Sequence, residues 1–171
     1  MRGGGGGTFG VVTSVTYETH ELVPLSGVFV LSNFSTPDIA QKVVTEYLKI
    51  HPSLADAGWG GYTGNLSPTS LTFFYVAPNV SLATGNATML PFINFAQNAT
   101  GGAFQWFVAP YDSFYPWYDS LFTTGSQVGT SFEMASRLIP RDILEKDSAK
   151  VAKTLLSFGG GAGIEYVICS W

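Results

Sequence analysis

The sequence predicts an α+β fold, in which an antiparallel sheet has helices on one face. Short segments rich in β-branched and aromatic residues occur in pairs along the chain, and single helix-type segments separate the pairs. The resulting order is β-β-α-β-β-α-β-β-α-β, and paired strands between helices favour an antiparallel sheet. At 171 residues, of which 46% are hydrophobic, the chain is long enough for one sizeable core.

The first predicted elements are a glycine-rich loop and a strand. Residues 3–10 read G-G-G-G-G-T-F-G, and such glycines permit positive φ and the close approach of another group. A β-branched run from Val11 to Tyr17 follows and predicts a strand. The loop contains the G-x-G-x-x-G spacing of dinucleotide sites, but that motif needs a strand before it and a helix after it. The Rossmann interpretation is therefore rejected.

A first helix is predicted from Pro37 to about Pro52. Ser35 or Thr36 is the expected N-cap, Pro37 occupies the first turn, and Asp38 complements the helix dipole. Apolar residues then recur at a spacing of four, at Ile39, Val43, Tyr47 and at Ala40, Val44, Leu48. Pro52 is expected to end the helix.

The remaining elements follow the same signals. Further strands are predicted over about residues 27–31, 58–62, 71–76, 103–109, 131–139 and 164–169. A turn at residues 64–68 suits a hairpin between two of them. Helices are expected over about 87–97 and within 141–158, the second with a new cap at Asp147. Residues 110–124 form an aromatic segment that is expected to be irregular.

Composition narrows the classes of partner. Charged residues make up 12% of the chain, about half the usual share, and the net charge is −4. There is no block of Lys or Arg, so neither nucleic acid nor an anionic membrane is an expected partner. No apolar run reaches the length of a membrane span. One cysteine and two histidines give no metal-ligand spacing, so no metal site is expected.

The asparagines indicate secretion. Five of the six occur in N-x-[ST] sequons, namely Asn33, Asn65, Asn79, Asn86 and Asn98. Glycans at these positions would supply the polar surface that charge does not. Asn65 is the weakest of them, because Pro68 follows its serine. The alternative is loop-forming asparagine that stands beside Ser and Thr by chance. No signal peptide is present in this chain, so we expect the true N-terminus to lie upstream.

The glycine loop also carries a family resemblance. Residues 2–13, R-G-G-G-G-G-T-F-G-V-V-T, resemble the end of the FAD-binding domain in berberine-bridge-enzyme-like oxidases. These belong to the vanillyl-alcohol-oxidase (PCMH-type) superfamily, and the nearest likeness is to its secreted fungal branch. The family pattern has asparagine where Thr8 stands here. Residues 136–141, S-R-L-I-P-R, also resemble fungal members.

The resemblance implies a domain organisation and a cofactor. Residues 1–22 would be the end of the FAD-binding domain, and residues 23–171 would be part of the substrate-binding domain. The parent enzyme would bind FAD, remove a hydride from an alcohol-type or sugar-like small molecule, and pass the electrons to oxygen. The loop residues that would contact the flavin are Gly4, Gly5, Gly6, Gly7, Thr8, Phe9, Gly10, Val11 and Val12. Consecutive glycine N–H groups can form an anion-binding nest, which is consistent with that role.

The resemblance also implies that parts of the parent enzyme lie outside this chain. The His and Cys that hold the flavin covalently in the family precede the glycine loop, and His20 and Cys169 do not match them. The catalytic base of the family lies beyond Trp171. We therefore expect a fragment of a longer enzyme, with a catalytically inactive secreted glycoprotein module or a gene-model fragment as the alternative.

Three residues are weak catalytic candidates. Tyr111 and Tyr115 lie in the aromatic segment, where a tyrosine of lowered pKa could act as a base and aromatic rings could line an apolar pocket. The alternative is an ordinary loop that packs on the sheet. Glu133 lies in a predicted strand, with its side chain on the face opposite Phe132 and Met134. It would be a polar group on a sheet face, or simply an exposed glutamate.

Overall fold

The computed structural model of the chain describes residue 7, residues 9–122 and residues 138–158. The described elements are β1 (Leu25–Asn33), α1 (Pro37–Asp56), β2 (Gly60–Ser67), β3 (Ser70–Pro78), α2 (Leu82–Ala99), β4 (Trp106–Tyr111), α3 (Phe114–Phe122) and α4 (Arg141–Phe158). The strands form one sheet in the order β2-β3-β1-β4, and every neighbouring pair is antiparallel. The predicted α+β class with an antiparallel sheet is confirmed.

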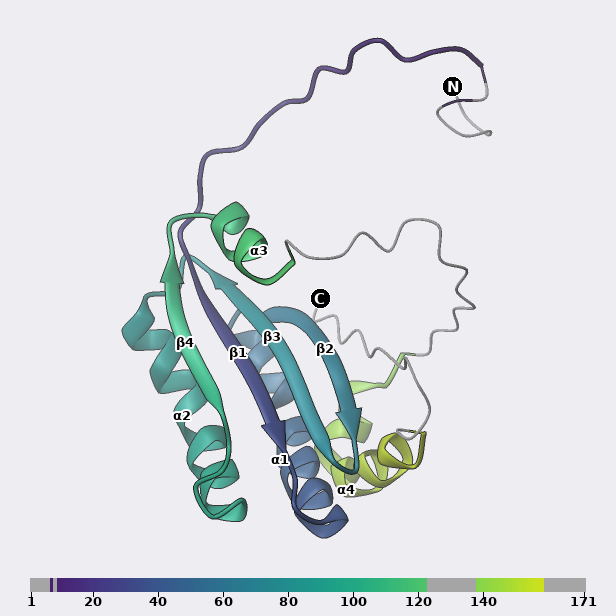
Figure 1. Ribbon diagram of the computed structural model, residues 1–171, viewed down its shortest axis with the longest axis vertical. Helices are drawn as coiled ribbons and strands as arrows, with labels where there is room; N and C mark the ends of the chain where they lie inside the picture. Colours follow the sequence, from purple (N-terminus) through teal and green to yellow (C-terminus); the bar gives the residue numbers. More distant parts are fainter. Residues whose placement is uncertain (1–6, 8, 123–137, 159–171) are drawn as a thin grey trace.

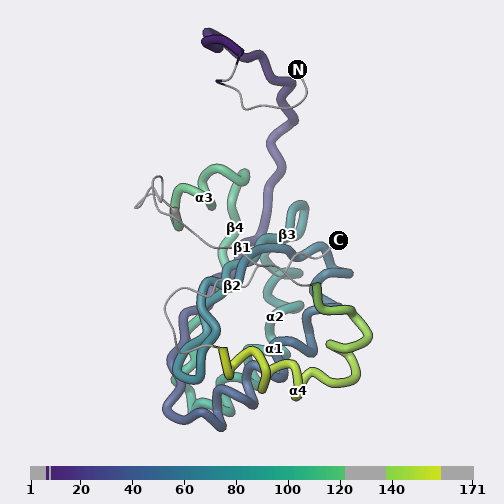
Figure 2. The backbone as a smooth tube through the Cα atoms, turned by 90° about the vertical axis from the view of Figure 1, so that its right-hand side faces the viewer, coloured from purple at the N-terminus to yellow at the C-terminus, as the bar shows by residue number. Residues whose placement is uncertain are grey.

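The helices divide unequally between the two faces of the sheet. Helices α1 and α2 cover one face, and α4 packs against α1 and β2 on that same side (Figure 1). Helix α3 lies at one end of the strands on the opposite side, as the rotated view shows (Figure 2). We call the face under α1 and α2 the core face, and the other one the open face.

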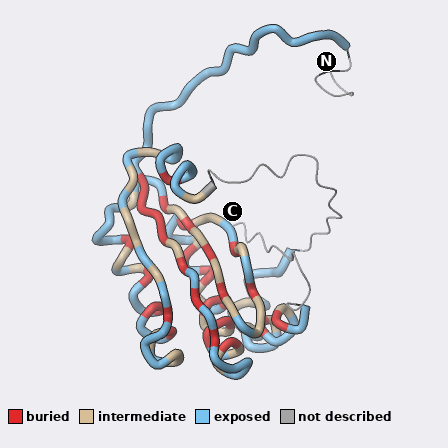
Figure 3. The backbone as a smooth tube through the Cα atoms, in the orientation of Figure 1, coloured by how far each residue is buried: buried red, intermediate tan, exposed pale blue. Residues whose placement is uncertain are grey.

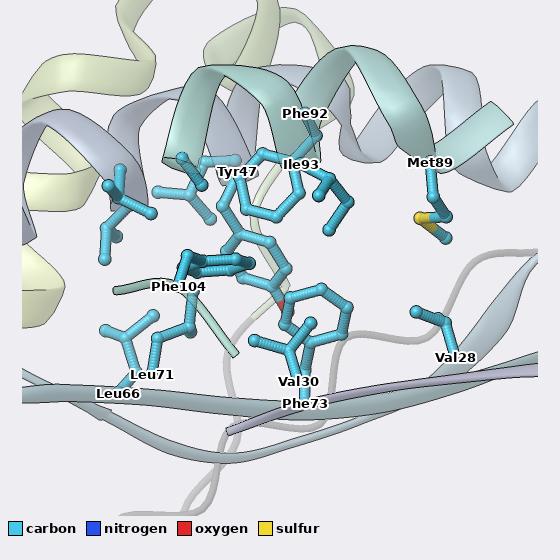
Figure 4. Packing of buried hydrophobic residues seen from close by; sticks show 14 of the residues in the cluster. Val28, Val30, Tyr47, Leu66, Leu71, Phe73, Met89, Phe92, Ile93 and Phe104 are labelled. Carbon is cyan, nitrogen blue, oxygen red and sulfur yellow. The ribbon is translucent and has the colours of Figure 1, made fainter. Parts of the chain in front are cut away.

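The hydrophobic core lies between the sheet and helices α1 and α2 (Figure 4). Alternate strand residues such as Val28, Val30 and Phe73 point into it and are at most 1% exposed. Tyr47 from α1 and Phe92 from α2 fill the space above them. Burial alternates along β3, and along β1 from Val28 onward, whereas residues 25–28 of β1 are all buried (Figure 3).

Helix α1 begins as predicted but ends later. The Thr36 side chain accepts a hydrogen bond from the backbone N–H of Ile39, and Pro37 occupies the first turn. The prediction that Pro52 ends the helix is wrong, since the helix continues to Asp56. Proline removes a single N–H donor, and the extra turn places Leu54 in the core at 3% exposure. Burial of that side chain offsets the missing hydrogen bond.

Strands β2 and β3 form the predicted hairpin, but its turn is shorter than expected. Only Pro68 and Thr69 separate the strands. Gly64 lies inside β2, where the register shifts at a β-bulge between Thr63 and Asn65. Gly61 has a φ of 156°, and a Cβ there would lie 2.1 Å from the carbonyl oxygen of Phe74. The strand therefore requires glycine at that position.

Helix α2 and strand β4 differ from their predicted limits. The helix begins five residues before the expected start, at Leu82 instead of residue 87, because the Ser81 side chain accepts from the N–H of Thr84 and caps it. It continues past Pro91 and stops before the two glycines at 101 and 102, both of which have positive φ. Strand β4 covers residues 106–111 and not 103–109.

The expectation of an irregular segment over residues 110–124 is wrong for α3. Tertiary packing determines this helix, because its Trp117 is 3% exposed and lies against Gly27 of β1. Helix α4 has the predicted interruption, since Asp147 has non-helical φ and ψ of −128° and 29°. Arg141 at its start donates two hydrogen bonds, of 2.8 and 2.7 Å, to the carboxylate of Asp56 and so ties α4 to the end of α1.

Other predicted strands have different outcomes. The strand expected over residues 11–17 is absent, because these residues are exposed and pair with no strand in the described part of the chain. β-branched residues favour extended backbone, but a strand also needs a hydrogen-bonded neighbour. Leu138 and Ile139 are not in a strand, and residues 131–137 lie outside the described residues. The strand expected over 164–169 also lies outside them.

Candidate functional site: an aromatic row on the open sheet face

Four aromatic side chains form a row across the whole open face. Tyr62 on β2 is the register partner of Phe74 on β3, Phe74 is the partner of Phe29 on β1, and Phe29 is the partner of Phe107 on β4. The ring centroids of Phe29 and Phe107 are 5.4 Å apart, and those of Tyr62 and Phe74 are 5.7 Å apart. We call these four residues the aromatic row. Directly paired aromatics of this kind stabilise neighbouring strands.

Helix α3 adds a fifth ring beside the row. The ring of Trp117 lies 6.4 Å from that of Phe74 and is buried above Gly27. A Cβ at Gly27 would lie 2.8 Å from Cδ1 of Trp117 and 3.0 Å from the ring of Tyr111. The absence of a side chain at Gly27 therefore creates the place where Trp117 and Tyr111 meet the sheet.

On the open face, the four strands combine large exposed rings with an absence of charged residues. Tyr62 is 49% exposed and Phe107 is 46% exposed. Leu31, on the same face, is 48% exposed. None of the four strands contains a charged residue, and none occurs between Asp56 and Asp112. Exposed apolar patches of this kind mark binding sites or interfaces. The face is suited to contact a planar apolar molecule or a further protein layer.

A second cluster of polar side chains lies on the core face and is closed to solvent. Nδ1 of His51 lies 2.9 Å from the carbonyl oxygen of Tyr47, so it carries the proton. Nε2 therefore accepts from the hydroxyl of Tyr75, at 2.7 Å. The hydroxyl of Tyr75 is also hydrogen-bonded to that of Tyr47, which in turn contacts Thr63. The four side chains form one hydrogen-bonded network between α1, β2 and β3.

Burial keeps this network uncharged. Desolvation lowers the pKa of His51 to about 4, although its hydrogen bond to the Tyr47 carbonyl acts in the opposite direction. Burial raises the pKa of Tyr75 to about 12 and holds the pKa of Tyr47 well above its ordinary value. Neutral groups without access to solvent cannot exchange protons with a substrate, so the network supports the fold. It fixes Tyr75 on β3, and the residue before Tyr75 is Phe74 of the aromatic row.

Comparison with known proteins gives relatives of one kind, although no family model matches the chain. An FAD-linked oxidoreductase of Arthroderma benhamiae is 29% identical over 92% of this chain and 28% of its own length. The FAD-linked oxidoreductase phmC of Phaeosphaeria nodorum is 32% identical over 77% of this chain and 28% of its own length. The chain is a relative of the FAD-linked oxidoreductases.

Solved structures agree with this relationship at the level of the fold. Two VAO-type flavoproteins of Myceliophthora thermophila C1 superpose with TM-scores of 0.63 and 0.64, at 18% and 17% identity. The superpositions cover 82% and 81% of this chain, but 26% and 27% of those proteins. The predicted resemblance to FAD-linked oxidoreductases is thus confirmed, and the fold is that of VAO-type flavoproteins. The chain spans between a quarter and a third of the length of these relatives.

The structure brings the three catalytic candidates of this chain together only in part. Tyr111 lies at the end of β4 beside Gly27 and so borders the open face. Tyr115 is on α3 and is 70% exposed. Glu133 lies outside the described residues. Within the described ranges no group of three or more His, Cys, Asp or Glu residues could hold a metal ion, and no helix is long and apolar enough to cross a membrane.

The flavin-loop candidates are described only in part. Gly4, Gly5, Gly6 and Thr8 lie outside the described residues, whereas Gly7, Phe9, Gly10, Val11 and Val12 are all exposed. Residues 9–12 belong to a described N-terminal segment that extends away from the sheet (Figure 1). A Cβ added at Gly7 or Gly10 would meet no atom within 4 Å. The loop therefore leaves room for another group at its glycines.

The sequence analysis did not single out the aromatic row. All four of its residues fall within predicted strands, and each strand places alternate side chains on one face. The missing information was the register between strands that are distant in sequence, which the hydrophobic pattern alone does not give.

Proposed function

We propose that this chain forms part of the substrate domain of an FAD-linked oxidoreductase, and that the open face borders the chamber in which substrate meets the flavin. The observation that carries the proposal is the aromatic row on a sheet face whose strands contain no charged residue and on which Tyr62 and Phe107 are exposed. Its support from relatives is that they are named FAD-linked oxidoreductases. Ligand sites are lined mainly by apolar and aromatic side chains with few polar groups, and this face has that character.

The reaction would be the two-electron oxidation of a small molecule. When bound, FAD would supply the acceptor for a hydride from an alcohol-type or sugar-like carbon, and oxygen would take the two electrons and two protons to give hydrogen peroxide. In this chain the aromatic row would exclude water and hold the substrate by its apolar part. Tyr111 borders the face beside Gly27, and its hydroxyl would orient a polar group of the substrate.

The N-terminal segment would contact the cofactor. We assign residues 1–22 to the end of an FAD-binding domain and residues 23–171 to the substrate domain, as the family resemblance implies. The exposed apolar side chains of this segment, which include Val11 at 91% and Tyr17 at 78% exposure, would be covered by that domain. Fit to FAD is supported by the open space at Gly7 and Gly10.

The test uses the full-length protein. After desalting, it should retain the flavin absorbance band at about 450 nm. Phe107→Gln places an amide in the aromatic row and should shift that band and slow flavin reduction by substrate. Phe158→Gln is the matched control, because Phe158 is 57% exposed at the end of α4, on the other side of the sheet. A colourless protein, or identical spectra and rates for both variants, contradicts the proposal.

We further propose that the protein enters the secretory pathway and carries N-glycans. The support is the set of five sequons and the scarcity of charge. Asn33, Asn65, Asn79 and Asn98 are exposed, and Asn86 is partly buried.

A further inference from the structure

We propose that Asn86 and Asn98 on α2 are N-glycosylation sites whose glycans cover the apolar outer surface of that helix, and that Asn65 is left unmodified. This inference rests on the proposed passage through the secretory pathway and not on the redox chemistry. It sorts the sequons by their place in the fold.

Helix α2 has no charged side chain to solvate its outer surface. It has 18 residues and contains no Asp, Glu, Lys or Arg. Its buried stripe includes Met89, Phe92 and Ile93, which pack on the sheet. Outside that stripe, Leu82, Leu90 and Phe95 are 37%, 41% and 39% exposed. A surface helix normally carries charged or polar residues on the side away from the core.

The other two helices on the core face show the contrast. The charged residues of α1 and α4 include Lys42, Glu46, Lys49, Arg141, Asp142, Glu145, Lys146, Asp147, Lys150 and Lys153. Neither helix contains a sequon. Four of the five sequons instead lie between Asp56 and Asp112, in the stretch of chain that has no charged residue. Sequons and charges therefore occupy different parts of this molecule.

The positions on α2 match the apolar residues individually. Leu82 and Leu90 are four residues before and after Asn86, and Phe95 is three residues before Asn98. Residues three or four apart are neighbours on a helix surface. A glycan on Asn86 would therefore extend over both leucines, and one on Asn98 would extend over Phe95. Each exposed large apolar side chain of α2 thus has a sequon asparagine beside it.

Asn65 has the opposite environment. It is the register partner of Thr72, and the next residue of β2, Leu66, is buried on the core face. Because successive side chains of a strand alternate between faces, Asn65 projects on the open face. Its Nδ2, the atom to which a glycan would be attached, donates a 3.0 Å hydrogen bond to Oγ of Ser70. A glycan there would replace one of the two hydrogens on this nitrogen and would cover the face that carries the aromatic row.

Site occupancy can be measured on the full-length protein secreted from a fungal host. Enzymatic glycan release in heavy-oxygen water converts each glycosylated asparagine to a mass-labelled aspartate. Chymotryptic peptides are needed, because no Lys or Arg lies between Asp56 and Asp112. The proposal expects label at Asn86 and Asn98 and none at Asn65. Unlabelled Asn86 and Asn98 overturn it and indicate that protein covers α2. Equal label at Asn65 overturns the sorting by face.

A second test asks whether the glycans on α2 cover its apolar surface or are attached there without that effect. Asn86→Gln combined with Asn98→Gln should lower the yield of soluble secreted protein several-fold, whereas Asn65→Gln should not. Leu90→Lys and Phe95→Glu, added to the double variant, should restore the yield because they replace glycan by charge. Wild-type yield from the double variant contradicts the proposal. Flavin absorbance of the same preparations reports the redox proposal separately, so the two can fail independently.

Discussion

Phe73 and Phe74 are neighbours on β3, yet they belong to two different environments. Phe73 is fully buried on the core face, where its ring stacks on Tyr47 at 4.9 Å. Phe74 lies on the open face in the aromatic row, next to Tyr62, which is 49% exposed. The core face has its helices and a completed hydrogen-bond network. The open face has rings of similar size, of which Tyr62 and Phe107 are 49% and 46% exposed while Trp117 of α3 lies beside Phe74. Such exposed rings are suited to contact a ligand or a further protein layer.

The largest expected difference between the faces comes from removing one ring from each. Phe73→Ala should lower the free energy of unfolding by about 3–5 kcal/mol, because it leaves a cavity among fully packed side chains. Phe107→Ala should cost about 1 kcal/mol or less, since Phe107 is 46% exposed. Denaturant unfolding measures both values. Equal losses would show that the open face contributes to stability as much as the core does.

Acid should weaken the core face through His51. The pKa of this buried imidazole is lowered from 6.5 to about 4. Between these values the unfolded chain binds a proton that the folded chain does not, so stability falls as the pH falls. The free energy of unfolding falls by about 1.4 kcal/mol per pH unit in this range, or about 3 kcal/mol in all. Above pH 6.5 the contribution of His51 to the free energy of unfolding is constant.

Unfolding by denaturant at a series of pH values checks this slope. His51→Gln should reduce it, whereas His20→Gln should not, because His20 is exposed. An unchanged slope in the His51 variant contradicts the assignment.

The hydroxyl groups of two tyrosines provide a matched comparison of intermediate size. Tyr75→Phe removes the hydroxyl between His51 and Tyr47 and leaves the Nε2 atom of His51 without its donor. The expected cost is about 1–3 kcal/mol, as for other buried polar groups that lose a partner. Tyr62→Phe on the open face should change stability by less than about 0.5 kcal/mol. Similar unfolding free energies for the two variants would be evidence against the buried network.

A small effect is expected at the place where α3 contacts the open face. Gly27→Ala adds a Cβ 2.8 Å from Cδ1 of Trp117, so the indole must move. We expect a cost of about 1 kcal/mol and a red shift of tryptophan fluorescence as Trp117 becomes exposed. The same substitution made together with Trp117→Phe should give no such shift. A shift that persists in the double variant would assign the signal to another tryptophan.

The sequence predicted those features that depend on local chemistry. The capping side chain of Thr36, Pro37 after it, and the break at Asp147 are properties of a few adjacent residues, and all three are confirmed. Features decided by distant residues were missed. Helix α3 forms where Trp117 finds space over Gly27, and α1 continues past Pro52 because the added turn buries Leu54.

The candidate site shows the same limit. The strands that supply the aromatic row were predicted, but the register that aligns Phe29 with both Phe74 and Phe107 depends on pairing between segments that are far apart in sequence. Tyr111 was selected for its place in an aromatic segment, and it does border the open face. Tyr115 was selected by the same signal and is mostly exposed, since the pattern did not reveal which residues α3 directs toward the sheet.

The position of β1 has a consequence for how the chain folds. β1 comes first along the chain among the four strands, yet it lies inside the sheet, between β3 and β4. Only two residues join β2 to β3, and the β2–β3 hairpin therefore closes a short loop. Strand β1 instead pairs with distant segments, because Leu25 is the register partner of Pro78 on β3 and of Tyr111 on β4. We expect the hairpin to form first, β1 to add to it, and β4 to arrive last. Until then, one edge of β1 exposes unpaired backbone groups and is open to pairing with other chains.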